Sequence, residues 1–162
     1  EILDKTREIV IQEFEKSDED VKDGMDIALV ALKPQTSDSN AFDLKYAGAH
    51  ISLWIIRKGS EVIEEIKADK EPIGKFENMK PFETHNLIIN EGDQFYIFSD
   101  GFADQFGGEK GKKFKTANFK KLLLQNKDKT MDEQKRLLFK SFEDWKGSLE
   151  QLDDLCVIGV QI

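Results

Sequence analysis

The spacing of apolar residues changes along the chain from a helical pattern to a strand pattern and back, and this order limits the possible folds. Residues 2–16 carry apolar side chains at helical spacing, and short apolar or alternating runs separated by Gly, Pro and Ser fill residues 25–99. Helical spacing returns from Thr116, and the apolar run LCVIGVQI closes the sequence. The order of one helix, about six strands, two helices and a final strand predicts antiparallel sheet covered by helices.

Three details of this pattern are specific enough to check. The run MDIALVAL is mainly apolar, so it predicts a strand over residues 25–33 that is buried on both faces. Thr130 and Glu133 have the spacing of a capping box at the start of the last helix, and Gly147 suits its end. Cys156 lies inside the final apolar run, which predicts a place in the core.

Composition excludes several classes of protein. Lys and Arg number 24 against 32 Asp and Glu, and the net charge of −8 disfavours binding to nucleic acid. The single cysteine cannot form an internal disulfide, and no apolar run reaches the roughly 18 residues that a membrane span needs. We therefore expect one domain over residues 1–162, in the cytoplasm and without direct membrane contact.

Acidic residues stand at the ends of two predicted strands. Asp100 and Gly101 directly follow the strand FYIFS, and Asp153 and Asp154 directly precede LCVIGV. Carboxylate oxygens are the ligands that Mg²⁺ and Mn²⁺ prefer, and a shared cation would compensate the paired charges. Acidic residues are also common turn formers at strand ends, so spacing alone leaves both interpretations open.

The sequence around these acids resembles a known family. GDQFYIFSDGFADQFGG and LEQLDDLCVIGVQI look like the two C-terminal motifs of the metal-dependent type 2C serine/threonine phosphatases (PPM). DGMDIALVAL and YAGAHISLWIIRKG are similar to the strands between motifs in the SpoIIE-like bacterial branch. The resemblance implies an α+β fold, a mainly antiparallel β-sandwich flanked by helices in an αββα arrangement.

The resemblance also implies a set of metal ligands. Asp100 matches a metal aspartate of the family, with Gly101 as the adjoining turn glycine, and Asp153 matches its last metal aspartate, with Asp154 as the neighbouring acid. Asp23 is the candidate for a weaker third metal. The implied cofactors are two Mn²⁺ or Mg²⁺ ions, with a metal-activated water rather than a side chain as the nucleophile.

One motif of the family does not occur in this sequence. The first metal motif, an Asp followed by a Gly-His-Gly turn, has no counterpart, so the resemblance implies the C-terminal part of a domain truncated at its N-terminus. The missing aspartate helps to bridge the two metals in the family. Two functions therefore stay open: a protein phosphatase in the intact protein, or a noncatalytic phosphatase-like module that binds a partner.

Two further groups are candidates for contacts with the substrate. His50, between two predicted strands, is either a phosphate contact or a structural loop histidine. The loop GGEKGKKFK, with Lys112 and Lys113 at its centre, either attracts a phosphorylated protein by charge or is simply solvated.

The resemblance also implies partners. A phosphorylated signalling protein, for example an anti-sigma-factor antagonist, is the implied substrate, and sensor or regulatory domains are implied upstream. Sheet edges and apolar surface uncovered by the missing strands predict a homo-oligomer formed through an exposed edge.

Overall fold

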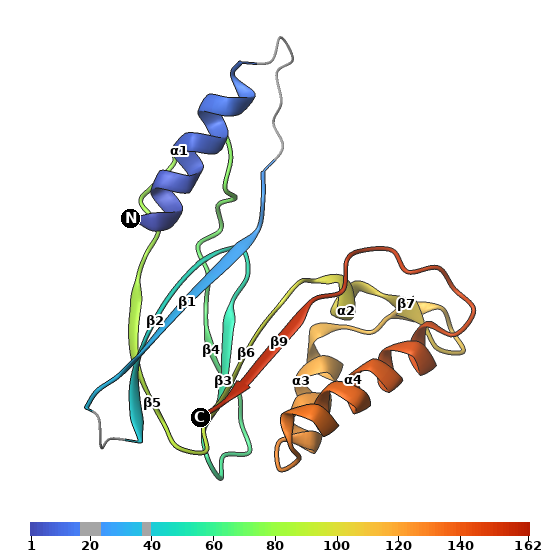
Figure 1. The fold of residues 1–162 in the computed structure, drawn as a ribbon. Coiled ribbons are helices and arrows are strands. Elements are labelled where there is room, and N and C mark those ends of the chain that lie inside the picture. The colour runs from blue at the N-terminus through green and yellow to red at the C-terminus, as the bar shows by residue number, and fades with distance from the viewer. Residues whose placement is uncertain (17–23, 37–39) are drawn as a thin grey trace. The chain divides into compact units, whose positions relative to one another are not determined.

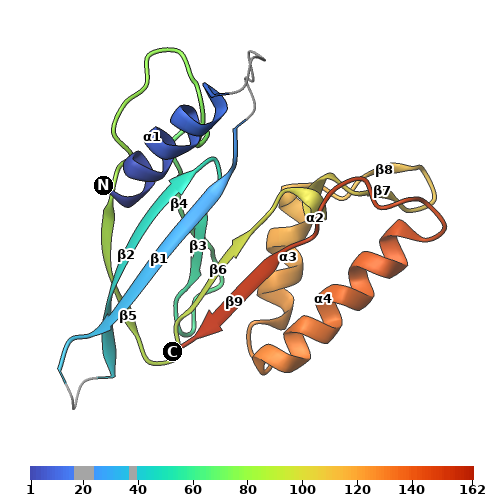
Figure 2. The ribbon, with the colours of Figure 1, turned by 45° about the horizontal axis from the view of Figure 1, so that its top comes forward.

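The structure is a computed structural model that describes residues 1–16, 24–36 and 40–162. The chain divides into two compact units, one made of Glu1–Leu53 with Glu65–Glu91, the other of Trp54–Glu64 with Gly92–Ile162. Figures 1 and 2 label the helices and strands of both.

The first unit combines one helix with a three-stranded antiparallel sheet. Its elements are α1 (Ile2–Phe14), β1 (Ile27–Pro34), β2 (Ala41–Ala49) and β5 (His85–Asn90). The strand order is β1-β2-β5. One hydrophobic cluster of this unit brings together buried side chains from its helix, sheet and long loop: Leu3, Ala49, Ile73 and Phe82.

A buried arginine ties α1 to the irregular segment before β5. Arg7 lies 2.7 Å from the carboxylate of Glu71, donates to the carbonyl oxygen of Lys80 at 2.6 Å, and sits 4.5 Å over the ring of Phe82. The helix predicted for residues 2–16 is confirmed over Ile2–Phe14, but the apolar stripe is only partly buried: Leu3 and Arg7 are buried, whereas Ile2, Ile9 and Phe14 are exposed.

The strand predicted at residues 25–33 is present as β1, but the prediction that both of its faces are buried is wrong. Residues 27–30 are half-buried and residues 31–34 are exposed. β1 has a single strand neighbour, β2, in the described sheet, so it is an edge strand. An apolar run alone does not distinguish a central strand from an edge strand.

The second unit contains most of the remaining elements, and the division between the units falls within β3 and β4, because Leu53, Glu65 and Ile66 belong to the first unit. The remaining elements are β3 (Leu53–Ile56), β4 (Glu64–Ile66), β6 (Gln94–Phe98), α2 (Gly101–Asp104), β7 (Phe106–Gly107), β8 (Lys112–Lys113), α3 (Thr116–Asn126), α4 (Met131–Lys146) and β9 (Val157–Gln161). One sheet has the order β4-β3-β6-β9, with β6 antiparallel to both β3 and β9. A small hairpin, β7-β8, forms a separate two-stranded sheet.

Aromatic side chains form the core of the second unit. Phe119 of α3 is fully buried and stacks on Phe102 of α2, with 4.4 Å between ring centroids. Trp54 of β3 and Phe142 of α4 belong to the same cluster. Helices and sheet are thus joined through large buried rings, which contribute much of the apolar area removed from water.

The C-terminal helices confirm the sequence prediction in detail. The capping box of α4 is present, because Glu133 N donates to the side chain of Thr130 and Thr130 N donates to the carboxylate of Glu133. Gly147 ends the helix with a positive φ of 57°. Cys156 is exposed, so its predicted place in the core is wrong: it precedes β9, outside the apolar cluster.

The predicted fold class is confirmed as α+β with antiparallel sheets and helices. The assignment of residues 1–162 to one domain stays a prediction. None of the helices in the described ranges has the length and apolar character needed to cross a bilayer.

Candidate functional site

Two short acidic segments lie at one end of the sheet in the second unit, and we call them the acidic turns: residues 100–101 and 153–154. The first follows β6 and the second precedes β9. β6 and β9 are antiparallel neighbours in a register that sets Phe98 opposite Val157. The end of one strand therefore lies beside the start of the other, as Figure 1 shows, and the two turns are neighbours in space.

Hydrogen bonds from Ser99 hold the two turns together. The Ser99 hydroxyl donates to the carbonyl oxygen of Asp154 at 2.7 Å and accepts from the backbone N–H of Cys156 at 2.9 Å. The Ser99 backbone N–H also donates to the carbonyl oxygen of Cys156 at 2.9 Å. This one serine extends the ladder between β6 and β9 up to the acids, a role that sequence reasoning missed.

Gly101 is required by the close approach of the second turn. A Cβ at this position would lie 2.5 Å from the carbonyl oxygen of Asp154 and 3.4 Å from that of Asp153. Both contacts involve backbone, which cannot swing away as a flexible side chain can. The absence of a side chain at Gly101 thus lets residues 153–154 lie directly against the start of α2.

The carboxylates of the acidic turns face solvent. Asp100, Asp153 and Asp154 are all exposed. The Asp153 carboxylate accepts the backbone N–H of Asp154 at 2.7 Å, which fixes its direction at the turn. Three accessible carboxylates at adjoining turns form an acidic surface that attracts cations.

The strand that precedes Asp100, β6, is fixed to helix α4. Tyr96 of β6 is buried, and its hydroxyl lies 2.7 Å from the side-chain oxygen of Gln134 in α4. Burial raises the pKa of the Tyr96 hydroxyl to about 12 even though the hydrogen bond to Gln134 lowers it, so the group stays protonated at neutral pH. The buried Tyr96–Gln134 contact therefore holds β6, the strand that leads to Asp100, against α4.

The other predicted site residues lie elsewhere or are paired. Asp23 lies outside the described residues. His50 belongs to the first unit, has a positive φ of 60°, and its Nδ1 lies 2.8 Å from the carboxylate of Asp26, a partner that sequence reasoning missed. Lys112 and Lys113 form β8 in the second unit, and Lys113 is ion-paired with Asp104 at 2.7 Å.

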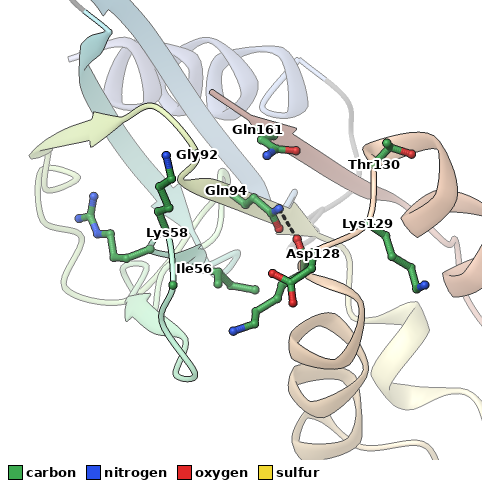
Figure 3. Close-up of a pocket in the computed structure, with 11 residues that line it drawn as sticks. Ile56, Lys58, Gly92, Gln94, Asp128, Lys129, Thr130 and Gln161 are labelled. Carbon is green, nitrogen blue, oxygen red and sulfur yellow. Dashed lines mark hydrogen bonds between the residues drawn. The ribbon is translucent and has the colours of Figure 1, made fainter.

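A pocket of about 340 Å³ lies at the opposite ends of β6 and β9 (Figure 3). Gln94 lines it and donates to the backbone carbonyl oxygen of Lys127 at 2.6 Å. Two of its cations are already paired, because Arg57 contacts Asp93 and Lys127 contacts Glu61. Of the described residues that line this pocket, only Asp128 is an acid, so the pocket is a weaker candidate for a divalent cation than the acidic turns, which carry three exposed carboxylates.

The sequence matches the model of one protein family over its full length. The family model described as Stage II sporulation protein E (SpoIIE) matches residues 1–162, the full length of the sequence. The chain belongs to the SpoIIE family. The predicted resemblance to SpoIIE-type type 2C phosphatase domains is thereby confirmed.

Solved structures of such domains are similar to this chain. The SiaA-PP2C domain of Pseudomonas aeruginosa is 26% identical with a TM-score of 0.62, and the match covers 75% of this chain and 49% of that one. The phosphatase domain of the cell fate determinant SpoIIE from Bacillus subtilis is 18% identical with a TM-score of 0.55, covering 99% and 71%. Its Mn-presoaked form gives 17% and 0.55, with the same coverage. No curated protein sequence matches the chain.

The acidic turns carry the oxygen donors that a divalent-cation site would need, and their role as metal ligands stays a prediction. Carboxylate oxygens suit a hard divalent cation. The close packing at Gly101 brings the backbones of the two turns together. Within residues 1–16, 24–36 and 40–162, however, no three His, Cys, Asp or Glu side chains come together closely enough to hold a metal by themselves. Water or further protein ligands would have to complete the coordination.

Proposed function

We propose that this chain is part of a metal-dependent phosphatase domain that hydrolyses phosphoserine or phosphothreonine on a signalling protein. The observation that carries the proposal is the junction of the acidic turns by Ser99 and Gly101, in a chain that belongs to the SpoIIE family. The chain spans about half of the SiaA-PP2C domain it matches, so phosphatase activity of this chain is part of what we propose.

In this proposal the acids have distinct roles. Asp100 and Asp153 hold Mn²⁺ or Mg²⁺, Asp154 adds negative charge beside them, and Gly101 keeps the two turns in contact. A divalent ion bound there would polarise a phosphoryl oxygen and lower the pKa of a water molecule. Asp23, outside the described residues, remains a candidate ligand of a further ion.

The proposed setting is bacterial signal transduction in the cytoplasm. The substrate class we infer is a phosphorylated regulator, such as an anti-sigma-factor antagonist, under the control of upstream sensor domains. Homo-oligomers through an exposed sheet edge remain part of the proposal. β9 has only one strand neighbour among the described strands, and its Ile158 is 48% exposed.

One observation favours a second candidate function. The described residues contain no group of three metal-ligating side chains, which would also fit a noncatalytic module that binds a partner through a phosphatase-like fold. The two functions differ in whether the acidic turns support metal-dependent turnover.

Hydrolysis of p-nitrophenyl phosphate with and without Mn²⁺ tests the proposal. We expect Mn²⁺-dependent turnover that falls by about 10²-fold or more in Asp100→Asn, because a ligand of the ion that activates water and polarises the phosphoryl group is lost. Asp128→Asn is the matched control, since Asp128 is exposed at the opposite end of the same unit. Equal turnover in Asp100→Asn and the unsubstituted chain would contradict the metal role, and no turnover in any form would favour the binding module.

A further inference from the structure

Positive charge is concentrated in one segment of an acidic protein. Residues 106–121 contain six lysines and one glutamate, whereas the whole chain carries a net charge of −8. Four of the lysines lie in residues 106–115, which form β7, a turn and β8, and which we call the basic hairpin. Such a local reversal of sign creates an attractive field for an acidic partner.

The basic hairpin is firmly anchored to the end of α4. Gly108 N donates to the carbonyl oxygen of Trp145 at 2.8 Å, and a Cβ on Gly107 would lie only 1.9 Å from that oxygen. Phe114 is buried between the rings of Phe102 and Trp145, at centroid distances of 5.2 and 5.4 Å. The lysines therefore project from a fixed support rather than from a loose loop.

The same framework connects the basic hairpin to both acidic turns. α2 links Asp100 to the hairpin and is only four residues long, a rise of about 6 Å. The side chain of the buried Gln105 donates to the carbonyl oxygen of Glu150 at 2.9 Å and accepts from Leu152 N at 3.3 Å, just before the second turn. Figure 2 shows β7 and β8 next to α2.

Most of the lysine charges in the hairpin are unpaired. Lys113 is neutralised by Asp104. Lys110, Lys112 and Lys115 are exposed, and none of them forms an ion pair or side-chain hydrogen bond with any residue in the described ranges. A partner can contact these ammonium groups without first breaking an internal ion pair.

We propose that the basic hairpin is a docking surface for an acidic segment of the phosphoprotein substrate, which it orients with the phosphorylated residue toward the acidic turns. The inference rests on the proposed function for the direction of docking. Docking at a positive surface offsets the repulsion that an acidic substrate meets from the rest of this chain, and it speeds association. A protein is favoured over a nucleic acid because a chain of net charge −8 repels a long polyanion beyond the hairpin.

The test is the binding of a fluorescein-labelled 15-residue peptide that carries one phosphoserine among Asp and Glu, followed by fluorescence anisotropy. Binding is measured without metal, so no hydrolysis is needed. We expect the peptide to bind about tenfold or more weakly to Lys110→Glu/Lys112→Glu than to the unsubstituted chain. The control Lys45→Glu/Lys70→Glu changes net charge equally at exposed lysines of the first unit and should bind normally.

Three results would overturn the inference: equal binding by both double variants, equal binding of a peptide with Asn and Gln in place of the acids, or tighter binding of a labelled oligonucleotide than of the peptide. Thermal unfolding followed by circular dichroism checks the fold of each variant. Lys110→Gln/Lys112→Gln replaces the charge reversal if that variant fails to fold. Because this assay measures binding and the Mn²⁺ assay measures turnover, a failure of the docking surface is distinguishable from a failure of the proposed function.

Discussion

At the scale of single residues, the acidic turns depend on two side chains that carry no charge. The Ser99 hydroxyl donates to Asp154 of the second turn, and its backbone N–H donates to Cys156, two residues after that turn. Gly101 admits the backbone of residues 153–154 at a distance that no Cβ tolerates. The positions of the aspartates thus follow from local steric and hydrogen-bonding requirements, as well as from the strands that carry them.

Gly101→Ala should separate the acidic turns. The added Cβ meets backbone oxygen at 2.5 Å, so we expect a loss of about 1–3 kcal/mol in the free energy of unfolding, as for other overpacked sites. Urea unfolding measures this loss, and Mn²⁺-dependent hydrolysis should fall with it.

Gly59→Ala is the control for Gly101→Ala. Nothing lies within 4 Å of a Cβ at Gly59, and its φ of 73° makes alanine costly through backbone strain alone. It should lower stability without changing the dependence of hydrolysis on Mn²⁺. If Gly101→Ala is as stable and as active as the unsubstituted chain, the close approach of the two turns is not important for the site.

At the scale of elements, α4 begins at a charge-dependent cap. The carboxylate of Glu133 accepts from the backbone N–H and the hydroxyl of Thr130, and these hydrogen bonds lower the pKa of Glu133 from its ordinary value of 4.5. A carboxyl group whose pKa is lower in the folded state stabilises the fold above the unfolded value. That stabilisation is lost as the pH falls through the folded value.

Glu133→Gln should therefore flatten the acid side of the stability profile. The unsubstituted chain should lose more stability than Glu133→Gln as the pH is lowered below 4.5. The reason is that the Glu133 carboxylate takes up a proton in this range, whereas the amide of the variant does not. Urea midpoints measured at a series of pH values give the comparison, with Asp128→Asn as a control that keeps the steeper profile. Parallel profiles for Glu133→Gln and the unsubstituted chain would show that the cap carries no pH dependence.

The sequence predicted elements with strong local signals and missed those set by tertiary packing. The capping box at Thr130 and the Gly147 exit were readable because their geometry lies within a few residues. α2 and the β7-β8 hairpin are too short to show a period. Hydrogen bonds to Trp145 and Glu150, which are distant in sequence, fix their places. The exposure of β1 depends on strand order, which no local pattern reveals.

For the candidate site, the sequence predicted which acids are involved but not the contacts that surround them. Strand-end acids and the family resemblance pointed to Asp100 and Asp153, and the structure brings their turns together. Their roles as ligands stay a prediction. The pairing of His50 with Asp26 joins two loops whose approach depends on the antiparallel register of β1 and β2, so it could not be read from either segment alone.

At the scale of the whole molecule, negative and positive charges gather at different places, as the proposed phosphatase function requires. An acidic chain of the SpoIIE family carries accessible carboxylates at the acidic turns and a separate basic hairpin on the same framework. The acids suit cations, and the lysines suit an acidic substrate. In the proposed function, the two acidic turns act together as one metal site.

Paramagnetic broadening of amide NMR signals by Mn²⁺ tests whether one ion lies near both acidic turns. We predict that the signals of residues 99–102 and 153–156 broaden together at the same low Mn²⁺ concentration, because one ion lies near both turns. Asp100→Asn should weaken the effect at both segments, whereas Asp128→Asn should leave it unchanged. Broadening of one segment without the other, or equal broadening in Asp100→Asn, would show that the turns do not share a metal.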